Sequence, residues 1–150
     1  YRCEKCGNIV ALINNGGGTL ECCGQEMTKL VANTVDASQE KHVPAVSINQ
    51  NTIKVEVGST LHPMVPEHYI QWIALVDGNK IEIKYLKPGM EPKTKFYYNF
   101  EEEKIPYTDE GGEIPNCEGQ PCNFMCPEEK AYNIRIYEYC NLHGLWKTEI

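Results

Sequence analysis

The 150-residue sequence lacks a long hydrophobic run, a surplus of basic charge and any long helical pattern. No stretch approaches the roughly 18 consecutive apolar residues of a membrane span, so we expect no association with a membrane. The N-terminus, from Tyr1 to Cys6, lacks the apolar stretch of a signal peptide, and we therefore expect a cytoplasmic protein. No basic patch is evident, which argues against nucleic acid as a partner.

The net charge of −7 comes from one segment. Residues 101–130 hold nine acidic and two basic residues, so the other 120 residues carry 12 of each sign and are neutral overall. A single acidic segment does not identify a partner, and a solvated charged loop is the simplest interpretation.

Eight cysteines are many for a chain in which no export signal is visible. In that context, spaced cysteines bind metal more often than they form disulfides. They fall into three groups: Cys3, Cys6, Cys22 and Cys23; Cys117, Cys122 and Cys126; and Cys140.

The chain divides into two predicted domains, 1–33 and 34–150. The first holds two cysteine pairs around a glycine turn and is too short to bury a sufficient core, so a metal would have to stabilise it. The polar stretch from Asn33 to Lys41 is typical of a linker.

The second domain shows the alternation of apolar and polar residues that is typical of β-strands. About seven short strands with turn signals predict a mainly β protein with an antiparallel sandwich. The clearest candidates are residues 53–57, 69–76, 81–85, 95–100, 132–136 and 145–150. The run 69–76 is apolar almost throughout and predicts a buried central strand, followed by a tight turn at 77–79.

The first cysteine group predicts a four-thiolate metal site, in which Cys3-x2-Cys6 is followed after fifteen residues by Cys22-Cys23. Tetrahedral sulfur coordination suits zinc or iron, and the spacing leaves both open. Because Cys22 and Cys23 are adjacent, both sulfurs can reach one metal only with local strain, so we expect a distorted tetrahedron.

All four histidines lie in contexts typical of metal ligands, and one of them stands beside a cysteine in Cys140-x2-His143. A lone histidine is usually an ordinary surface or core residue, but here that interpretation would have to hold four times. Four imidazoles and one thiolate make five ligands, one short of octahedral, which indicates a redox iron with one open position. The predicted ligands are His42, His62, His68, Cys140 and His143.

These motifs resemble desulfoferrodoxin-type superoxide reductases, the form with two irons. The resemblance rests on the cysteine unit of residues 3–23 and on four further motifs that occur in the family's order: Glu40-Lys41-His42-Val43-Pro44, His62-Pro63-Met64, His68-Tyr69-Ile70-Gln71-Trp72 and Cys140-Asn141-Leu142-His143-Gly144-Leu145-Trp146. It implies a rubredoxin- or desulforedoxin-like FeS4 domain followed by an immunoglobulin-like sandwich, usually in a homodimer. It also implies iron rather than zinc in the first site.

The resemblance further implies two iron ions per chain, FeCys4 and FeHis4Cys, with the four histidines in one plane and Cys140 axial. Superoxide would be reduced to hydrogen peroxide at the open sixth position. Lys41 would attract superoxide, and Glu40 would be the candidate sixth ligand of the oxidised iron. Rubredoxin or a flavin reductase would supply the electron.

The sequence departs from the family in an acidic insertion at about 97–130, which contains Cys117, Cys122 and Cys126. We consider a loop with free thiols first, a disulfide second and a third metal site last. The third site lacks a fourth ligand, because no histidine remains to provide one.

Three other functions compete with superoxide reduction. The first is a blue-copper-like or iron electron-transfer protein without catalysis. A blue-copper site uses two histidines, one cysteine and a weak axial methionine, whereas this chain has four histidines and no methionine follows His143. A structural or metal-storage protein would not explain Glu40-Lys41 beside an open site. A dismutase would have to accept an electron from superoxide, which an electron-donating thiolate disfavours.

Overall fold

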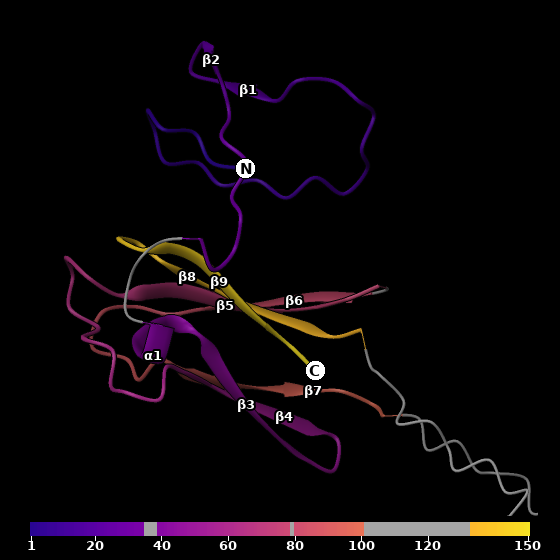
Figure 1. Ribbon diagram of the computed structural model, residues 1–150, viewed down its shortest axis with the longest axis vertical. Coiled ribbons are helices and arrows are strands. Elements are labelled where there is room, and N and C mark those ends of the chain that lie inside the picture. Colours follow the sequence, from indigo (N-terminus) through magenta and orange to yellow (C-terminus); the bar gives the residue numbers. More distant parts are fainter. Residues whose placement is uncertain (35–38, 79, 101–132) are drawn as a thin grey trace, which may run out of the picture.

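The computed structural model describes residues 1–34, 39–78, 80–100 and 133–150. The described chain forms a small N-terminal unit and a sandwich of two antiparallel sheets (Figure 1). Its elements are β1 (Glu21–Cys22), β2 (Gln25–Glu26), α1 (Gln39–His42), β3 (Pro44–Asn49), β4 (Thr52–Val57), β5 (Ile70–Asp77), β6 (Lys80–Tyr85), β7 (Lys93–Tyr97), β8 (Arg135–Cys140) and β9 (Gly144–Glu149).

The sandwich pairs a three-stranded sheet, in the order β3-β4-β7, with a four-stranded sheet, in the order β6-β5-β8-β9. All neighbouring strands are antiparallel. The expected mainly β, immunoglobulin-like sandwich is thus confirmed.

The core lies between the two sheets because each central strand turns its apolar side chains inward. In β4, Ile53, Val55 and Val57 are buried while Lys54 and Glu56 are exposed. Each fully buried side chain of this kind stabilises the fold by about 1.5–3 kcal/mol. The other main contributors are Ile70, Ile73 and Leu75 of β5, Phe96 of β7, and Ile136 and Cys140 of β8.

Strand β5 is the predicted central strand, and its pairing with β8 is irregular near the second predicted metal site. Ile70 pairs with Cys140 and Trp72 with Tyr139, so Gln71 is an extra residue in the ladder. This bulge explains why Ile70 and Ile73 are both buried although they are three residues apart.

The N-terminal unit has little core of its own, as its length predicts. Among its hydrophobic residues only Cys3 and Met27 are buried. Backbone bridges join Arg2 to Ile9 and to Thr28. The unit lies on the outer side of the four-stranded sheet, where it and the sheet line a cavity of about 650 Å³.

Three expectations about local structure were wrong. The third strand of the smaller sheet is Lys93–Tyr97 rather than 95–100, because Tyr98 instead bonds its N–H to Asn51 O (3.0 Å). Strand β3 had not been expected, since its side chains beyond Pro44 are largely exposed and show no alternation.

The third concerns the stretch 33–41, which is not simply a linker. It contains most of α1, and Asn33 is bonded to β9: Lys147 N–H donates to Asn33 Oδ1 (2.8 Å) and Asn33 Nδ2 donates to Lys147 O (3.1 Å). The boundary between 1–33 and 34–150 itself stays a prediction. No helix in the described part of the chain is long and apolar enough to cross a membrane.

Candidate metal centres

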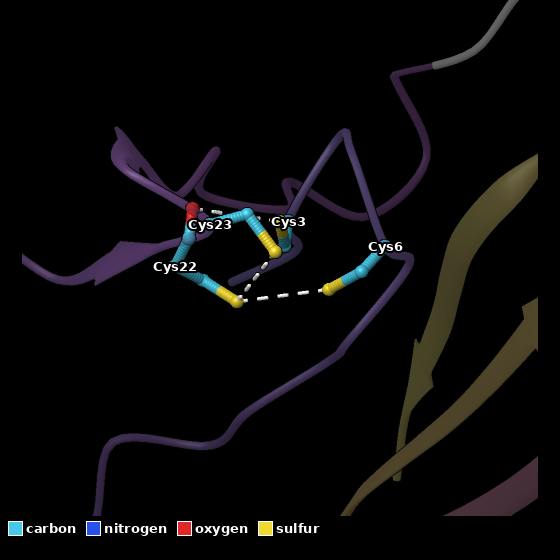
Figure 2. Close-up of side chains that lie close together, drawn as sticks. All are labelled: Cys3, Cys6, Cys22 and Cys23. Atoms are coloured by element: carbon cyan, nitrogen blue, oxygen red, sulfur yellow. Dashed lines mark hydrogen bonds between the residues drawn. The ribbon is translucent and has the colours of Figure 1, made fainter.

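The first predicted ligand set is gathered on the N-terminal unit. Figure 2 shows the four cysteine side chains turned toward one another from the loop at Cys3–Cys6 and the end of β1. The Sγ atom of Cys22 lies 3.6 Å from that of Cys6 and 3.8 Å from that of Cys23. Four sulfurs at about 2.3 Å around one metal stand about 3.8 Å apart, so these separations fit a tetrahedral thiolate site.

The expected strain at the adjacent cysteines is present. Cys23 has a φ of 53°, in the left-handed region of backbone conformation that residues other than glycine rarely adopt. Gly24, at φ 71°, follows it and completes the turn.

The thiols of this cluster differ in acidity. A hydrogen bond from the backbone N–H of Cys6 is the main cause that lowers the pKa of Cys3 to about 6. Side-chain hydrogen bonds, mainly with Cys6 and next with Cys22, raise the pKa of Cys23 to about 12. One thiolate therefore forms readily, and the cluster keeps further protons until a cation displaces them.

The second set comes from three separate segments of the sandwich. His42 ends α1, His62 and His68 flank the turn before β5, and Cys140 and His143 enclose the turn between β8 and β9. Ligand atoms of His42, His68, Cys140 and His143 all lie within 4.8 Å of one another. His62 joins them, with its Nε2 atom 3.7 Å from Cys140 Sγ.

The four imidazoles form a square. Neighbouring ring centroids are 4.4–5.1 Å apart, with planes 72–81° from each other, around the circuit His42, His62, His68, His143. The diagonal pair, His42 and His68, is 6.0 Å apart and nearly parallel at 25°. Four side chains placed this way can offer nitrogen to one ion from four directions.

Among the described residues, Cys140 supplies the thiol at the square, and this thiol is fully buried. Its Sγ atom lies 3.6 Å from His143 Nδ1, and the residue is 0% exposed. Burial raises the pKa of this thiol, while the backbone N–H groups of His143 and Leu142 act in the opposite direction. These amides would stabilise a thiolate and moderate its donation to a metal.

Two of the imidazoles, those of His62 and His68, are held toward the neutral state, which is the state that binds metal. Burial, followed by the nearby charges of His68 and His42, lowers the pKa of His62 to about 4. Burial also lowers the pKa of His68. His68 Nε2 is buried without a hydrogen-bond partner among the described residues, and with the thiol and the other imidazoles beside it the donor set fits a bound transition metal.

The cluster is closed on one side and more open on the other. His42 and His62 are each 1% exposed, whereas His68 and His143 are half-buried. Solvent, and with it a small anion, therefore reaches the cluster from the side of His68 and His143.

Lys41 and Glu40 occupy α1, directly before His42. The positive charge of Lys41 contributes to the lowered pKa of both His62 and His68, so its ammonium group lies within electrostatic reach of the cluster. Glu40 is exposed and is not part of the ligand cluster.

Two residues of the recognised motifs have roles that we had not assigned. Asn141 joins the two turns, because its Oδ1 accepts from Tyr69 N–H (2.8 Å) and its Nδ2 donates to Glu67 O (3.0 Å). Trp146 stacks on His42 at 5.1 Å and donates from Nε1 to His143 O (3.1 Å). Their place between and beside predicted ligands was the available signal.

Glu138 was missed entirely. It is 0% exposed on β8, two residues before Cys140, and neither carboxylate oxygen has a hydrogen-bond partner in the described chain. Burial raises its pKa to about 9. Its alternation with Ile136 and Cys140 was the only sequence signal. The cysteines of the acidic insertion, Cys117, Cys122 and Cys126, lie outside the described residues.

A four-thiolate unit followed by a β-sandwich with a thiolate–imidazole cluster defines a class of protein with two metal sites, and the donor sets are consistent with two iron sites. Comparison with known proteins narrows this class. The desulfoferrodoxin family profile matches residues 34–149, and the profile of the desulfoferrodoxin N-terminal domain matches residues 1–30. The chain belongs to the desulfoferrodoxin family.

Individual relatives agree with this assignment. A desulfoferrodoxin from Desulfarculus baarsii is 38% identical over 149 residues, which is 99% of this chain and 94% of the relative. A superoxide reductase from Pyrococcus horikoshii is 28% identical over 131 residues, covering 83% of this chain and 97% of the relative. The crystal structure of the superoxide reductase from Treponema pallidum matches with a TM-score of 0.60 and 27% identity, over 93% of this chain and 91% of that one.

Proposed function

We propose that this protein is a superoxide reductase, which converts superoxide to hydrogen peroxide by adding one electron and two protons. The square of four imidazoles beside a buried thiolate, open on the side of His68 and His143, is the observation that carries the proposal. Similarity to proteins named superoxide reductase supports it.

We assign His42, His62, His68, Cys140 and His143 to hold one iron, and Cys3, Cys6, Cys22 and Cys23 to hold the other. When bound, ferrous iron at the second site would supply the electron. The buried thiolate of Cys140 favours that transfer because it donates electron density to the metal. The same donation argues against dismutation, which needs an electron to move the other way.

Lys41 attracts the substrate. The protein as a whole carries −7 and repels an anion, so a local cation is needed at the site. The ammonium group near His62 and His68 provides it and can orient a water that delivers a proton. We assign Glu40, the neighbour of Lys41, as the carboxylate that approaches the site after the product leaves.

An external donor must return the electron after each turnover, and we propose rubredoxin or a flavin reductase for this role. We also propose a homodimer in the cytoplasm.

The test is the yield when the anaerobically reduced protein meets a known amount of superoxide. One peroxide per superoxide with no oxygen evolved is the expected result. Half that yield, with matching oxygen, would mean dismutation and would overturn the argument from the thiolate.

A further inference from the structure

The turn formed by Gly58, Ser59 and Thr60 holds the segment that carries Lys41 and His42. Thr60 N–H donates to the carbonyl oxygen of Glu40 (2.9 Å), and Gly58 N–H donates to that of Val43 (3.2 Å). Ser59 Oγ adds a second bond to Glu40 O (3.3 Å). The segment 40–43 is thereby bonded to the turn at both of its ends.

Gly58 lies close against the backbone of this segment. A Cβ atom at this position would stand 2.7 Å from both the carbonyl carbon and the carbonyl oxygen of Lys41, and 2.8 Å from Glu40 O. These are backbone atoms, which cannot rotate away as the end of a flexible side chain can. Gly58 also has a φ of +78°, so any other residue would be strained there as well.

Gly89 serves as a comparison that separates the clash of a Cβ atom from the strain of a positive φ. Its φ of +84° imposes the same backbone demand, but a Cβ there would meet nothing within 4 Å. A Gly→Ala change at the two positions therefore differs in the clash with Lys41 and not in the type of backbone strain.

The turn also leads directly to His62, two residues after Thr60. One short stretch thus connects the backbone of Lys41 and His42 to that of another predicted ligand. We propose that Gly58 is a positioning residue for superoxide capture, which lets the backbone of Lys41 lie against the turn and so holds its ammonium group at the opening of the metal cluster. This inference rests on the proposed function.

The experiment compares G58A with G89A in the full-length, iron-loaded, reduced protein. Iron content and the second-order rate constant for superoxide, from pulse radiolysis at several ionic strengths, are measured for each. We expect G58A to keep its iron and to react about fivefold more slowly, with a weaker dependence on salt, because a small misplacement of a charged group slows capture. G89A should match the wild type, and equal rates for the two variants would overturn the proposal.

A double-mutant cycle with K41A tests the route of the effect. If Gly58 acts through Lys41, G58A should change the rate less than about twofold in the K41A background. A full fivefold loss in that background would show that Gly58 acts some other way and would overturn the proposal.

Ser59 provides a variant that adds no atoms, should G58A fail to fold. S59A removes one of the two hydrogen bonds to Glu40 O, and we expect the rate constant for superoxide to fall about twofold. This effect of S59A should disappear in the K41A background. A rate identical to that of the wild type would count against the proposal.

Amide hydrogen exchange at Thr60 distinguishes failure of this inference from failure of the proposed function. Faster exchange in G58A than in G89A shows that Gly58 holds the segment, whatever the protein does with superoxide. Equal exchange overturns the positioning role. A wild-type protein that gives no peroxide would instead overturn the function.

Discussion

At the scale of single residues, the second cluster buries ionisable side chains whose charged forms are unfavourable away from water. His62 and Cys140 are almost completely buried. Burial lowers the pKa of His62 and raises the pKa of Cys140, and both shifts favour the neutral form of the side chain. A metal ion reverses this preference at the thiol, because it binds the thiolate directly. Two residues near these predicted ligands lead to specific predictions: Lys41, whose charge acts on His62 and His68, and Glu138, a core acid with no hydrogen-bond partner among the described residues.

Lys41→Ala should slow superoxide capture by about tenfold while iron content stays unchanged, because it removes the local attraction for an anion. Pulse radiolysis and metal analysis measure the two quantities. Lys54→Ala is the matched control, since it removes the same charge from an exposed position on β4. A rate for Lys41→Ala equal to that of Lys54→Ala would remove Lys41 from the mechanism.

Glu138→Gln should increase the free energy of unfolding relative to the wild type, and this increase should be larger at higher pH. The folded-state pKa of Glu138 is raised to about 9, so between about pH 4.5 and pH 9 the unfolded chain is ionised while the folded chain keeps the proton. Wild-type stability from this group therefore falls as pH rises, and the amide variant lacks that loss.

Thermal or urea unfolding of the metal-loaded protein at pH 5.5 and 7.5 measures the effect. The difference in unfolding free energy between Glu138→Gln and wild type should grow by at least about 1 kcal/mol over this range. A difference that is independent of pH would show that Glu138 is already ionised in the folded protein.

At the scale of elements, the second cluster depends on where strands begin and end. Its predicted ligands lie at the ends of α1 and β8 or in the turns before β5 and β9, and none lies in the middle of a strand. The bulge at Gln71 separates His68 from the regular part of β5. It adds local twist next to the site, which is a common use of bulges.

Deleting Gln71 should leave a folded sandwich with a weakened second site. The deletion restores a regular ladder, and Ile70 and Ile73 still face the core because they become two positions apart. His68 then changes its position relative to Cys140, so metal content at the second site should fall while the first site keeps its metal.

Deleting Ala74, in the regular part of β5, is the matched comparison. That deletion sends half of the strand's buried residues to the other face and should abolish folding. Circular dichroism and metal analysis compare the two variants. Similar yields of folded protein from both would contradict the role given to the bulge.

At the scale of the whole molecule, the two metal sites differ in protection. The first lies on a unit with few buried residues, and Cys6 and Cys23 are exposed. The second lies at one end of the packed sandwich, with Cys140 fully buried. Metal leaves a site most easily where local opening costs little free energy.

A strong chelator should therefore remove metal from the first site at least about tenfold faster than from the second. Absorption spectroscopy with metal analysis over time follows both losses. In the four-cysteine unit, Cys6→Ser should speed the first phase without changing the second. Earlier loss from the imidazole–thiolate site would contradict this order.

Much of this protein can be predicted from its sequence because the informative signals are local. Alternation in 53–57 and 81–85 identified β4 and β6, and the apolar run at 69–76 identified the central strand. β3 could not be found this way, since an edge strand with mostly exposed side chains carries no alternation. The division at residue 33 and the metal ligands themselves stay predictions.

The sequence by itself determined the chemistry: which thiols and imidazoles are available, and which short spacings bring pairs of them together. Only the tertiary structure decided how residues about a hundred positions apart, such as His42 and His143, share one square. It also decided that Glu138 is buried with no hydrogen-bond partner in the described chain, and that Gly58 lies so close to Lys41 that a Cβ there would clash with its backbone. Spacing specifies contacts within one turn, whereas contacts between distant segments depend on how the two sheets pack.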